Sequence, residues 1–316
     1  MHKILITGGC GFIGSHLVEY FFEKYKKSQI IVYDKITYAA NLKNLKSIKN
    51  KKRLKIIIAD ILDYQKLLKA TKDVDIIIHA AAESHVDRSF SLNKKFIQTN
   101  VVGTRNVMEA SKINKVKKII HISTDEVYGE IQKGKFNENS NLNPSNPYSS
   151  SKAAAEMIIN GYIFSYRLPV IMIRGNNIFG TRQHYEKLIP ACCVNIIRGK
   201  KISIHGSGLQ ERSFIYVKDF CLAIHILIKK GKIFNTYNIG SNFEYKNIDV
   251  IKLILKKFNL KFEKNVKYVK DRPFNDFRYS IDISKIKKLS WKPKFKLENK
   301  INLIIGWYKK NYKQFL

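Results

Sequence analysis

The sequence predicts an α/β fold, in which a parallel, doubly wound sheet is joined to a smaller carboxyl-terminal lobe. In the first part of the chain, short apolar runs alternate with longer amphipathic stretches, which is typical of strands linked by crossover helices. Beyond residue 176 the pattern is less regular. We therefore expect a sheet domain over 1–175, with returning segments near 213–240, and a second lobe built from 176–212 and 241–316.

Composition favours a folded protein without metal. The chain has 316 residues, 45% of them hydrophobic and 12% aromatic, enough for a substantial core and too many for a disordered chain. The four cysteines lack metal-ligand spacing, and two of them are adjacent. We interpret them as reduced packing residues of a cytoplasmic protein: Cys10, Cys192, Cys193 and Cys221.

No membrane partner is expected. The first residues, from Met1 to Thr7, have the pattern of a strand that leads into glycines, not that of a signal peptide. The longest apolar runs, such as 221–228, are far shorter than the ~18 residues of a membrane span.

The formal net charge of +33 admits two interpretations. One is a nucleic-acid or anionic-surface binder. The other, which we favour, is a general bias towards lysine, because the lysines are scattered and form no single basic motif with interleaved aromatics. We thus expect no specific nucleic-acid partner, although the charge should attract acidic ligands.

The first motif is a glycine-rich turn between a strand and a helix. An apolar strand over 3–6 is followed by Gly8, Gly11 and Gly14, and then by a helical pattern over about 15–25. The first glycine permits a tight turn, the second lets a pyrophosphate approach the backbone, and the third lets helix and strand pack closely. This context predicts a Rossmann-like dinucleotide site, with Phe12 and Ile13 in the same turn.

Asp34 ends the second predicted strand, 20 residues beyond Gly14. A carboxylate at this distance is expected to bind the adenosine ribose, and it favours NAD over NADP because it would repel a 2′-phosphate. The alternative is an ordinary aspartate in a turn after a strand.

Two further strands are predicted over 54–59 and 75–79, and the second is followed by small residues, including Ala80 and Ala81. Small side chains would let a cofactor lie close to the backbone. A helical stretch over about 93–114 carries Thr99.

A buried strand over 119–122 leads into Thr124, Asp125 and Glu126. Neighbouring side chains of a strand point to opposite faces, so both acids can reach one ligand only if the chain has left the strand here. Ligands of open α/β sheets bind at the carboxyl ends of the strands, where this acid pair can serve acid–base chemistry. The alternative is a pair of solvated residues that cap a helix.

Tyr148 and Lys152 form the last motif. Asn146 can cap a helix that begins at Pro147, which places Tyr148 and Lys152 one turn apart on the same helix face. We expect the ammonium group to lower the pKa of the tyrosine, making it a base for a sugar or alcohol hydroxyl.

Together these motifs resemble the nucleotide-sugar 4,6-dehydratases of the extended short-chain dehydrogenase/reductase superfamily. The resemblance covers nearly the whole chain, and its most specific part is the Thr-Asp-Glu triplet. Arg-Gly-Asn-Asn at 174–177, together with Arg-Pro-Phe-Asn-Asp at 272–276, looks more like eukaryotic and large-virus members, some of which use UDP-glucose. Tyr185 replaces the family's usual proline before Glu186. The remaining elements that carry it are 7–14, 33–35, Ala81, 83–87, 127–129, 148–152, 186–190, 237–240 and 271–273.

The resemblance implies a hydro-lyase with bound NAD. It would convert dTDP-glucose or UDP-glucose to the 4-keto-6-deoxy sugar, the first step towards rhamnose or another deoxysugar. Tyr148 would deprotonate the C4 hydroxyl while NAD takes the C4 hydride, with Lys152 and Thr124 assisting. Glu126 would then remove the C5 proton, Asp125 would protonate the leaving C6 hydroxyl, and the hydride would return to C6.

The resemblance also implies the binding residues. NAD would contact Gly8, Gly11, Phe12, Ile13, Gly14, Asp34, Lys35, Asp60, Ile61, Ala80, Ala81, Thr99, Tyr148 and Lys152. The nucleotide sugar would contact Glu83, Ser84, His85, Val86, Asp87, Arg88, Asn177, Glu186, Lys187, Leu188, Arg212, Asn247 and Arg272. Asp87 and Arg88 could equally form a surface pair.

A homodimer is implied too, formed by the helices around 95–112 and 148–165. Its apolar residues could instead face the sheet: Val107, Met108, Met157 and Ile158.

Two rival functions stay open at this point. A C4 epimerase or decarboxylase of the same superfamily would need Tyr148 and Lys152 but not the Asp125–Glu126 pair. A non-catalytic protein that binds nucleic acid through its charge would need none of the four, and their presence argues against it.

Overall fold

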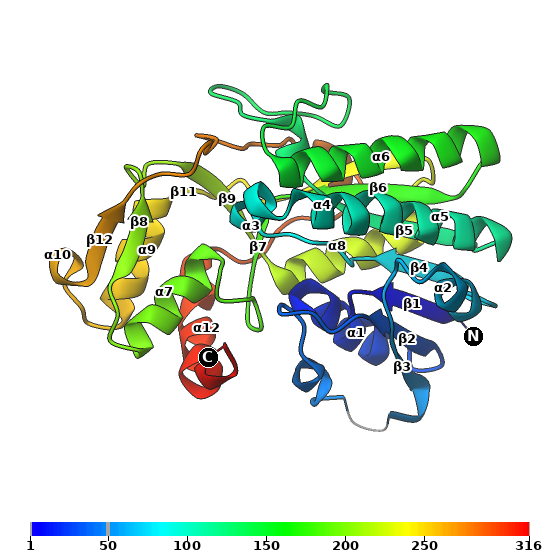
Figure 1. Cartoon of the computed structure of the whole chain (residues 1–316), viewed down its shortest axis with the longest axis horizontal. Helices are drawn as coiled ribbons and strands as arrows, with labels where there is room; N and C mark the ends of the chain where they lie inside the picture. Colours follow the sequence, from blue (N-terminus) through cyan, green and yellow to red (C-terminus); the bar gives the residue numbers. More distant parts are fainter. Residues whose placement is uncertain (1, 49–50, 316) are drawn as a thin grey trace.

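The computed structural model describes residues 2–48 and 51–315, and its main feature is one parallel sheet with helices on both faces (Figure 1). The order of the strands is that of a doubly wound fold, with the reversal between β1 and β4. In spatial order the strands are β10 (Asn235–Ile239), β6 (Val170–Gly175), β5 (Lys118–Thr124), β4 (Ile76–His79), β1 (Lys3–Thr7), β2 (Gln29–Asp34) and β3 (Leu54–Ile58).

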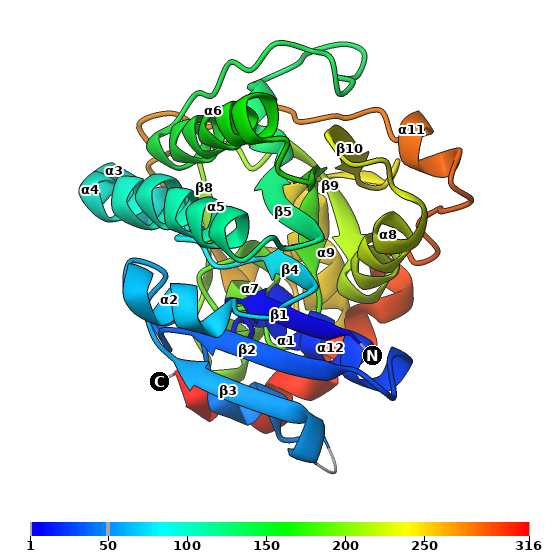
Figure 2. The same ribbon diagram turned by 90° about the vertical axis from the view of Figure 1, so that its right-hand side faces the viewer.

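Strand residues alternate between the two faces of this sheet, and each face has its own apolar core. In β1, Ile4 and Ile6 join the core under α1 (Phe12–Lys24) and α8 (Val217–Lys230), whereas Leu5 joins the opposite core. That second core lies under α2 (Tyr64–Ala70), α5 (Gly103–Ile113) and α6 (Pro147–Tyr166). Burial on both faces explains why the strands are apolar throughout rather than alternating (Figure 2).

A connection made of three short helical segments links β4 to α5 along the outer side of the sheet. It consists of α3 (Val86–Ser91), α4 (Asn93–Phe96) and a π-helical turn over Ile97–Val102. The stretch predicted as one helix over 93–114 is therefore helical but widened in its middle, and such widened turns often occur at functional sites. Here the turn carries Thr99 and the buried Asn100, whose amide hydrogen-bonds to both the N–H and the C=O of Glu83.

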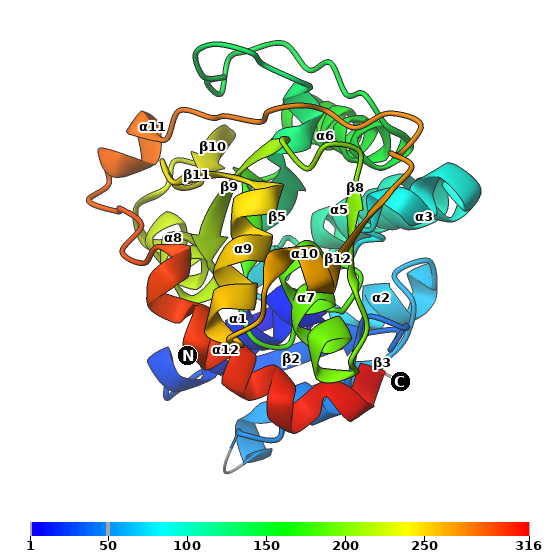
Figure 3. The same cartoon turned by 90° about the vertical axis from the view of Figure 1, so that its left-hand side faces the viewer.

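The second lobe contains two small sheets and several helices (Figure 3). One sheet joins β11 (Glu244–Lys246), β9 (Glu211–Tyr216) and β7 (Asn177–Phe179), and the other joins β12 (Val266–Val269) and β8 (Ile202–His205). Three elements lie in the returning segments near 213–240. Strand β10 joins the main sheet and α8 packs against that sheet, whereas β9 pairs within the second lobe. The helices of this lobe are α7 (Leu188–Ile197), α9 (Asn247–Lys257), α10 (Phe262–Asn265) and α12 (Leu297–Asn311), whereas α11 (Ser284–Lys287) packs against β10 of the main sheet.

Short 3₁₀ turns complete the fold. The functionally important one is Asp125–Tyr128, directly after β5, where Thr124 Oγ1 accepts a hydrogen bond from the N–H of Glu126. The strand begins one residue earlier and ends two residues later than the predicted 119–122, and the chain leaves it between Thr124 and Asp125. The others are Leu42–Leu45, Lys51–Arg53 and Tyr312–Phe315.

Candidate active site

A cavity of about 510 Å³ lies between the sheet and the second lobe, at the carboxyl ends of the strands. Its size is within the ordinary range for a small-molecule site. It begins where the strand order reverses, because Gly8 after β1 lies against Ala81 after β4: a Cβ at Gly8 would be 2.8 Å from Ala81 Cα. Residues of both lobes line it, including Asn247 of α9 and Leu188 of α7.

The glycine turn forms one end of this cavity. Gly8 has φ +68°, a conformation that favours glycine, and a Cβ on Gly14 would be 2.0 Å from Gly8 O. Around Gly11 there is space, since a Cβ there would meet only Gly8 O, at 3.4 Å. No side chain caps α1, so its first N–H groups are available to an anion such as a diphosphate.

Asp34 lies beside this turn at the end of β2. Its carboxylate accepts hydrogen bonds from the backbone N–H of Cys10 and of Ile36, both at 2.8 Å, and it lines the cavity. Burial raises the pKa of Asp34, while the backbone hydrogen bonds oppose that rise. Lys35 forms an ion pair with Asp60 at 2.6 Å across the same end of the cavity. A cleft with a glycine cradle and a carboxylate one strand away fits the diphosphate and ribose of a dinucleotide.

The structure brings almost all predicted site residues to this one cavity. Those that line it are Gly8, Gly11, Phe12, Ile13, Gly14, Asp34, Lys35, Asp60, Ile61, Ala80, Ala81, Glu83, Ser84, His85, Val86, Asp87, Thr99, Thr124, Glu126, Tyr148, Lys152, Asn177, Glu186, Lys187, Leu188, Arg212, Asn247 and Arg272. The two that do not are Asp125 and Arg88.

Asp125 lies behind the cavity wall. It is 4% exposed, and its Oδ2 accepts a hydrogen bond of 2.6 Å from Asn176 Nδ2. Burial, followed by the nearby charge of Glu126, raises the pKa of Asp125 to about 7. Thr124, whose Oγ1 donates a hydrogen bond of 3.3 Å to Asp125 Oδ1, does line the cavity. A carboxyl group that keeps its proton near neutral pH is suited to act as an acid.

Glu126 faces the cavity. Burial also raises its pKa, while the charges of Lys187 and Arg212 lower it. Asn146 Nδ2 lies 3.5 Å from Glu126 Oε2. The two adjacent acids thus differ in environment, and such a difference is how one site provides both an acid and a base.

Tyr148 and Lys152 lie on one face of α6 as predicted, but their electrostatics differ from the prediction. Lys152 Nζ donates a hydrogen bond of 2.7 Å to the carbonyl oxygen of Ile122, and burial lowers the pKa of Lys152 to about 8. The pKa of Tyr148 is raised, first by burial and then by the charge of Glu126. The predicted lowering is absent because the ammonium group is held on β5 rather than at the phenol oxygen.

Arg88 does not line the cavity, although it was predicted to contact the nucleotide sugar. Its Nε donates a hydrogen bond of 2.7 Å to Glu186 Oε1, and its guanidinium lies 3.8 Å from the ring centre of Tyr38. Arg88 thereby joins α3 to the loop before α7. That loop is also attached through His85, whose Nε2 is 3.0 Å from Glu186 O.

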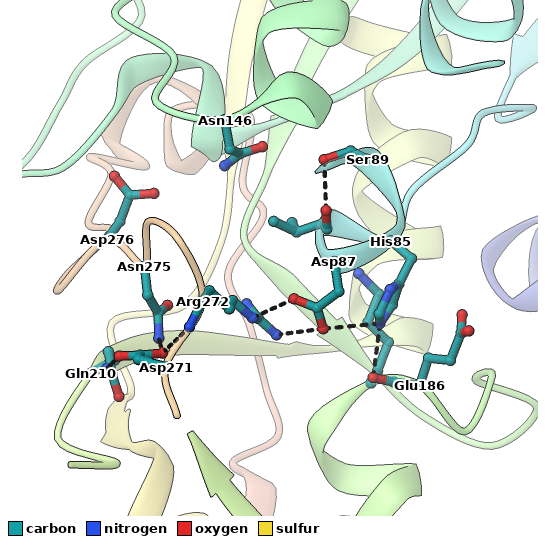
Figure 4. A network of polar contacts seen from close by, with 12 residues as sticks. His85, Asp87, Ser89, Asn146, Glu186, Gln210, Asp271, Arg272, Asn275 and Asp276 are labelled. Carbon is teal, nitrogen blue, oxygen red and sulfur yellow. Dashed lines mark hydrogen bonds and ion pairs between the residues drawn. The ribbon is translucent and has the colours of Figure 1, made fainter. Parts of the chain in front are cut away.

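Asp87 pairs with Arg272 rather than with Arg88. Arg272 Nε lies 2.6 Å from Asp87 Oδ1, so this contact joins α3 to the loop after β12 (Figure 4), and both residues line the cavity. The surface pair considered for Asp87 and Arg88 is therefore wrong. Arg212 is likewise engaged, because it donates hydrogen bonds of 3.0 and 2.7 Å to the carbonyl oxygens of Phe277 and Asp276.

Some residues that line the cavity were not predicted as site residues: Asn146, Asn176, Asp276 and Tyr279. Asn146 was predicted only as a helix cap. Its position directly before Pro147 and Tyr148 could also have indicated that its side chain reaches the site. Asp276 and Tyr279 lie on an irregular loop more than 100 residues beyond Tyr148, and no local pattern indicates that they reach this cavity.

Within the described residues, no helix is long and apolar enough to cross a membrane, and no group of three or more His, Cys, Asp or Glu side chains is arranged to hold a metal ion.

Comparisons with known proteins identify the family of the chain. The family model for GDP-mannose 4,6 dehydratase matches residues 5–304. A dTDP-D-glucose 4,6-dehydratase of Dictyostelium discoideum is 40% identical over all of this chain and 83% of its own length. A trifunctional UDP-glucose 4,6-dehydratase, 3,5-epimerase and reductase of Arabidopsis thaliana is 42% identical over 98% of this chain, which spans only 47% of that protein.

A solved structure gives the same result. The crystal structure of a dTDP-glucose 4,6-dehydratase from Streptomyces venezuelae, with NAD and TYD bound, has a TM-score of 0.95 and is 35% identical, covering 98% of each chain. Because the family model spans nearly the whole sequence and the Dictyostelium relative is matched over 83% of its own length, the chain belongs to the family of nucleotide-sugar 4,6-dehydratases, as its motifs predicted.

Proposed function

We propose that the protein uses NAD to convert dTDP-glucose or UDP-glucose to the corresponding 4-keto-6-deoxyglucose nucleotide. The observation that carries this proposal is the buried pair Asp125 and Glu126, in one turn at the end of β5, beside Tyr148. An epimerase or decarboxylase has no use for a second acid and base next to the Tyr–Lys pair, whereas the elimination of water requires both.

The protein's own groups account for the proton movements. Thr124 holds the C4 oxygen, and Tyr148 accepts the C4 hydroxyl proton. Glu126 removes the C5 proton once a ketone at C4 has made it acidic. Asp125, protonated near neutral pH, is the source of the proton that lets the C6 hydroxyl leave as water. Because Asp125 does not line the cavity, this proton passes through the hydroxyl of Thr124, which lies 3.3 Å from Asp125 Oδ1 and does line it. NAD, when bound, supplies the acceptor that takes the C4 hydride and returns it at C6.

Tyr148 must lose its proton during this cycle, although its pKa is raised in this structure. The nearest source of positive charge on its own helix is Lys152, so we propose that Lys152 assists ionisation of Tyr148 in the loaded site. The glycine turn and Asp34 would hold the diphosphate and adenosine ribose of NAD.

The remaining proposals concern organisation. We propose that 1–175, with 213–240, binds the cofactor and that 176–212, with 241–316, binds the nucleotide sugar. We propose a cytoplasmic protein, consistent with the four free, buried cysteines, and a product that serves the synthesis of rhamnose or another deoxysugar.

We also propose a homodimer through α5 and α6, which pack together on the outside of the sheet (Figure 2). Two of the predicted contact residues are excluded, because Val107 and Met108 are fully buried against the sheet. Met157 is 53% exposed and Phe164 76% exposed on α6, and such large apolar side chains suit a partner surface.

The test is a product assay in D₂O. The protein with NAD is offered dTDP-glucose, UDP-glucose, GDP-mannose and UDP-glucuronate, and products are identified by NMR. We expect a 4-keto-6-deoxy product with deuterium at C5, and the better of the two glucose nucleotides identifies the preferred base. Epimerised sugar, carbon dioxide or no product would contradict the proposal.

Variants then separate the steps. We expect Asp125→Asn and Glu126→Gln each to slow turnover by about 10²–10⁴-fold, the usual contribution of a general acid or base. Oxidation at C4 should survive, so reduced cofactor should accumulate and be visible by its near-ultraviolet absorbance. Full turnover in both variants would show that the two acids play no part in the chemistry.

A further inference from the structure

Asp276 is a buried carboxylate in the cavity wall to which the mechanism assigns no task. It is 2% exposed, lies on the loop between β12 and α11, and lines the cavity together with Tyr279. Figure 4 shows it beside the network that joins Asp271, Arg272 and Asn275, with no contact to any residue drawn there.

One of its two carboxylate oxygens is fixed by hydrogen bonds from other side chains of the protein. Asp276 Oδ2 accepts a hydrogen bond of 2.6 Å from Ser145 Oγ and another from the hydroxyl of Tyr279. Asp276 Oδ1 is buried and accepts none from any residue of 2–48 or 51–315. The carboxylate is thus oriented, and half of its capacity to accept hydrogen bonds is left unused.

The backbone of this loop is fixed as well. Arg212 donates hydrogen bonds to the carbonyl oxygens of Asp276 and Phe277, and its guanidinium lies 4.5 Å from the ring centre of Tyr279. In the described part of the chain, the carboxylate of Asp276 forms no ion pair with a Lys, Arg or His side chain. A buried carboxylate oxygen without a donor costs free energy, and a ligand hydroxyl would remove that cost.

The chemistry of the site narrows the choice of hydroxyl. Thr124 and Tyr148 take the C4 hydroxyl, and Asp125 and Glu126 act at C5 and C6. Asp276 is close enough to Glu126 that its charge contributes to raising the pKa of that acid. The ring hydroxyls without an assigned partner are those at C2 and C3, and each is a hydrogen-bond donor.

We propose that Asp276 Oδ1 accepts a hydrogen bond from the C2 or C3 hydroxyl of the glucosyl ring. Asp276 is then a substrate-binding residue that fixes the rotation of the ring above Glu126. This inference rests on the proposed function, since it assumes a nucleotide-linked glucose in the cavity.

The test compares Asp276→Asn with the unchanged protein on three substrates. These are the preferred glucose nucleotide and its 2-deoxy-2-fluoro and 3-deoxy-3-fluoro analogues, in which fluorine keeps the size but cannot donate a hydrogen bond. We expect Asp276→Asn to lower kcat/KM about 10- to 100-fold on the parent substrate, since hydrogen bonds to charged groups are among the strong ones. On one of the two analogues the loss should shrink to about threefold or less, which identifies the hydroxyl.

Two further variants keep the test decisive. Ser145→Ala leaves Asp276 in place but removes one of the groups that orient it, so it should show the same substrate pattern with a smaller loss. Asp271→Asn is the matched control, because both oxygens of Asp271 are hydrogen-bonded, to Arg272 N, Asn275 Nδ2 and Gln210 Nε2, and it lies outside the cavity lining. Any loss from Asp271→Asn should be equal on all three substrates.

An equal loss on all three substrates for Asp276→Asn would overturn the inference and make Asp276 a support of its loop only. Failure of the proposed function looks different, because the unchanged protein would then dehydrate no glucose nucleotide at all. In that event calorimetric binding of the same three compounds decides the inference, through the same comparison of Asp276→Asn with the unchanged protein.

Discussion

At the scale of single residues, Asp125 shows how burial raises the pKa of a carboxyl group towards neutrality. Its neighbours are Asn176, which stabilises the carboxylate, and Glu126, which opposes it, and burial outweighs the hydrogen bond. The proton is therefore retained up to about pH 7, where an ordinary aspartate has long been ionised. The raised pKa of Asp125 also makes the free energy of unfolding depend on pH.

We expect Asp125→Asn to stabilise the fold at pH 8 but not at pH 4. Between the unfolded pKa near 3.9 and the folded pKa of about 7, only the folded state keeps the proton, so the native protein loses stability as pH rises through this window. The neutral asparagine removes this loss, which can reach about 4 kcal/mol if 1.36 kcal/mol applies per pKa unit. Urea unfolding at the two pH values measures it.

Asp63→Asn provides a control with the opposite sign. Asp63 caps α2, and its hydrogen bond from Lys66 N lowers its pKa, so its charge favours the native state at neutral pH and loses that effect on acidification. This variant should lose stability at pH 8 relative to pH 4. If Asp125→Asn behaved in the same way, the raised pKa of Asp125 would be wrong.

At the scale of an element, the start of α6 connects helix stability to catalysis. Asn146 Oδ1 accepts a hydrogen bond of 2.9 Å from Ser149 N, and Ser149 Oγ lies 3.2 Å from Asn146 N, which together form a capping box. The amide nitrogen of the same side chain lies towards Glu126. Helix capping and orientation of the base therefore depend on one residue.

Substitutions at Asn146 can separate these two effects. Asn146→Ala should lower the free energy of unfolding by about 1 kcal/mol, the usual cost of a lost cap, and should also slow turnover. Serine caps helices well but is too short to reach Glu126, so Asn146→Ser should retain stability and show the kinetic loss alone. Urea unfolding together with kcat/KM makes the comparison, and a loss of activity that followed stability in both variants would contradict a role towards Glu126.

At the scale of the whole molecule, the exposed face of α6 predicts the assembly. A charge at the centre of an apolar interface is strongly unfavourable. We expect Phe164→Glu and Met157→Glu to convert a dimer to a monomer in sedimentation-velocity experiments.

Leu303→Glu on α12 is the matched control. The exposed fraction of Leu303, 52%, is nearly that of Met157, but Leu303 lies in the second lobe. This variant should leave the sedimentation coefficient unchanged. A monomeric unchanged protein, or a dimer that survives both α6 variants, would rule out this interface.

Much of the fold could be predicted from local patterns. Close backbone approach requires the glycines at 8 and 14, burial on both faces accounts for the apolar strands, and Asn146 and Pro147 mark the start of α6. Each of these signals can be recognised within a short stretch of sequence. Predictions based on them, including the Asp34 position and the Thr124–Glu126 turn, agree with the structure.

Only the tertiary structure decided how side chains from separate units pair. Arg88 and Asp87 are adjacent in sequence, yet one pairs with Glu186 and the other with Arg272, far along the chain. Asp276 enters the cavity because Arg212 and Ser145 hold its loop there. The motifs by themselves determined the family and the chemical groups of the site, whereas burial, which depends on everything packed around a group, decided the pKa values and the partners of those groups.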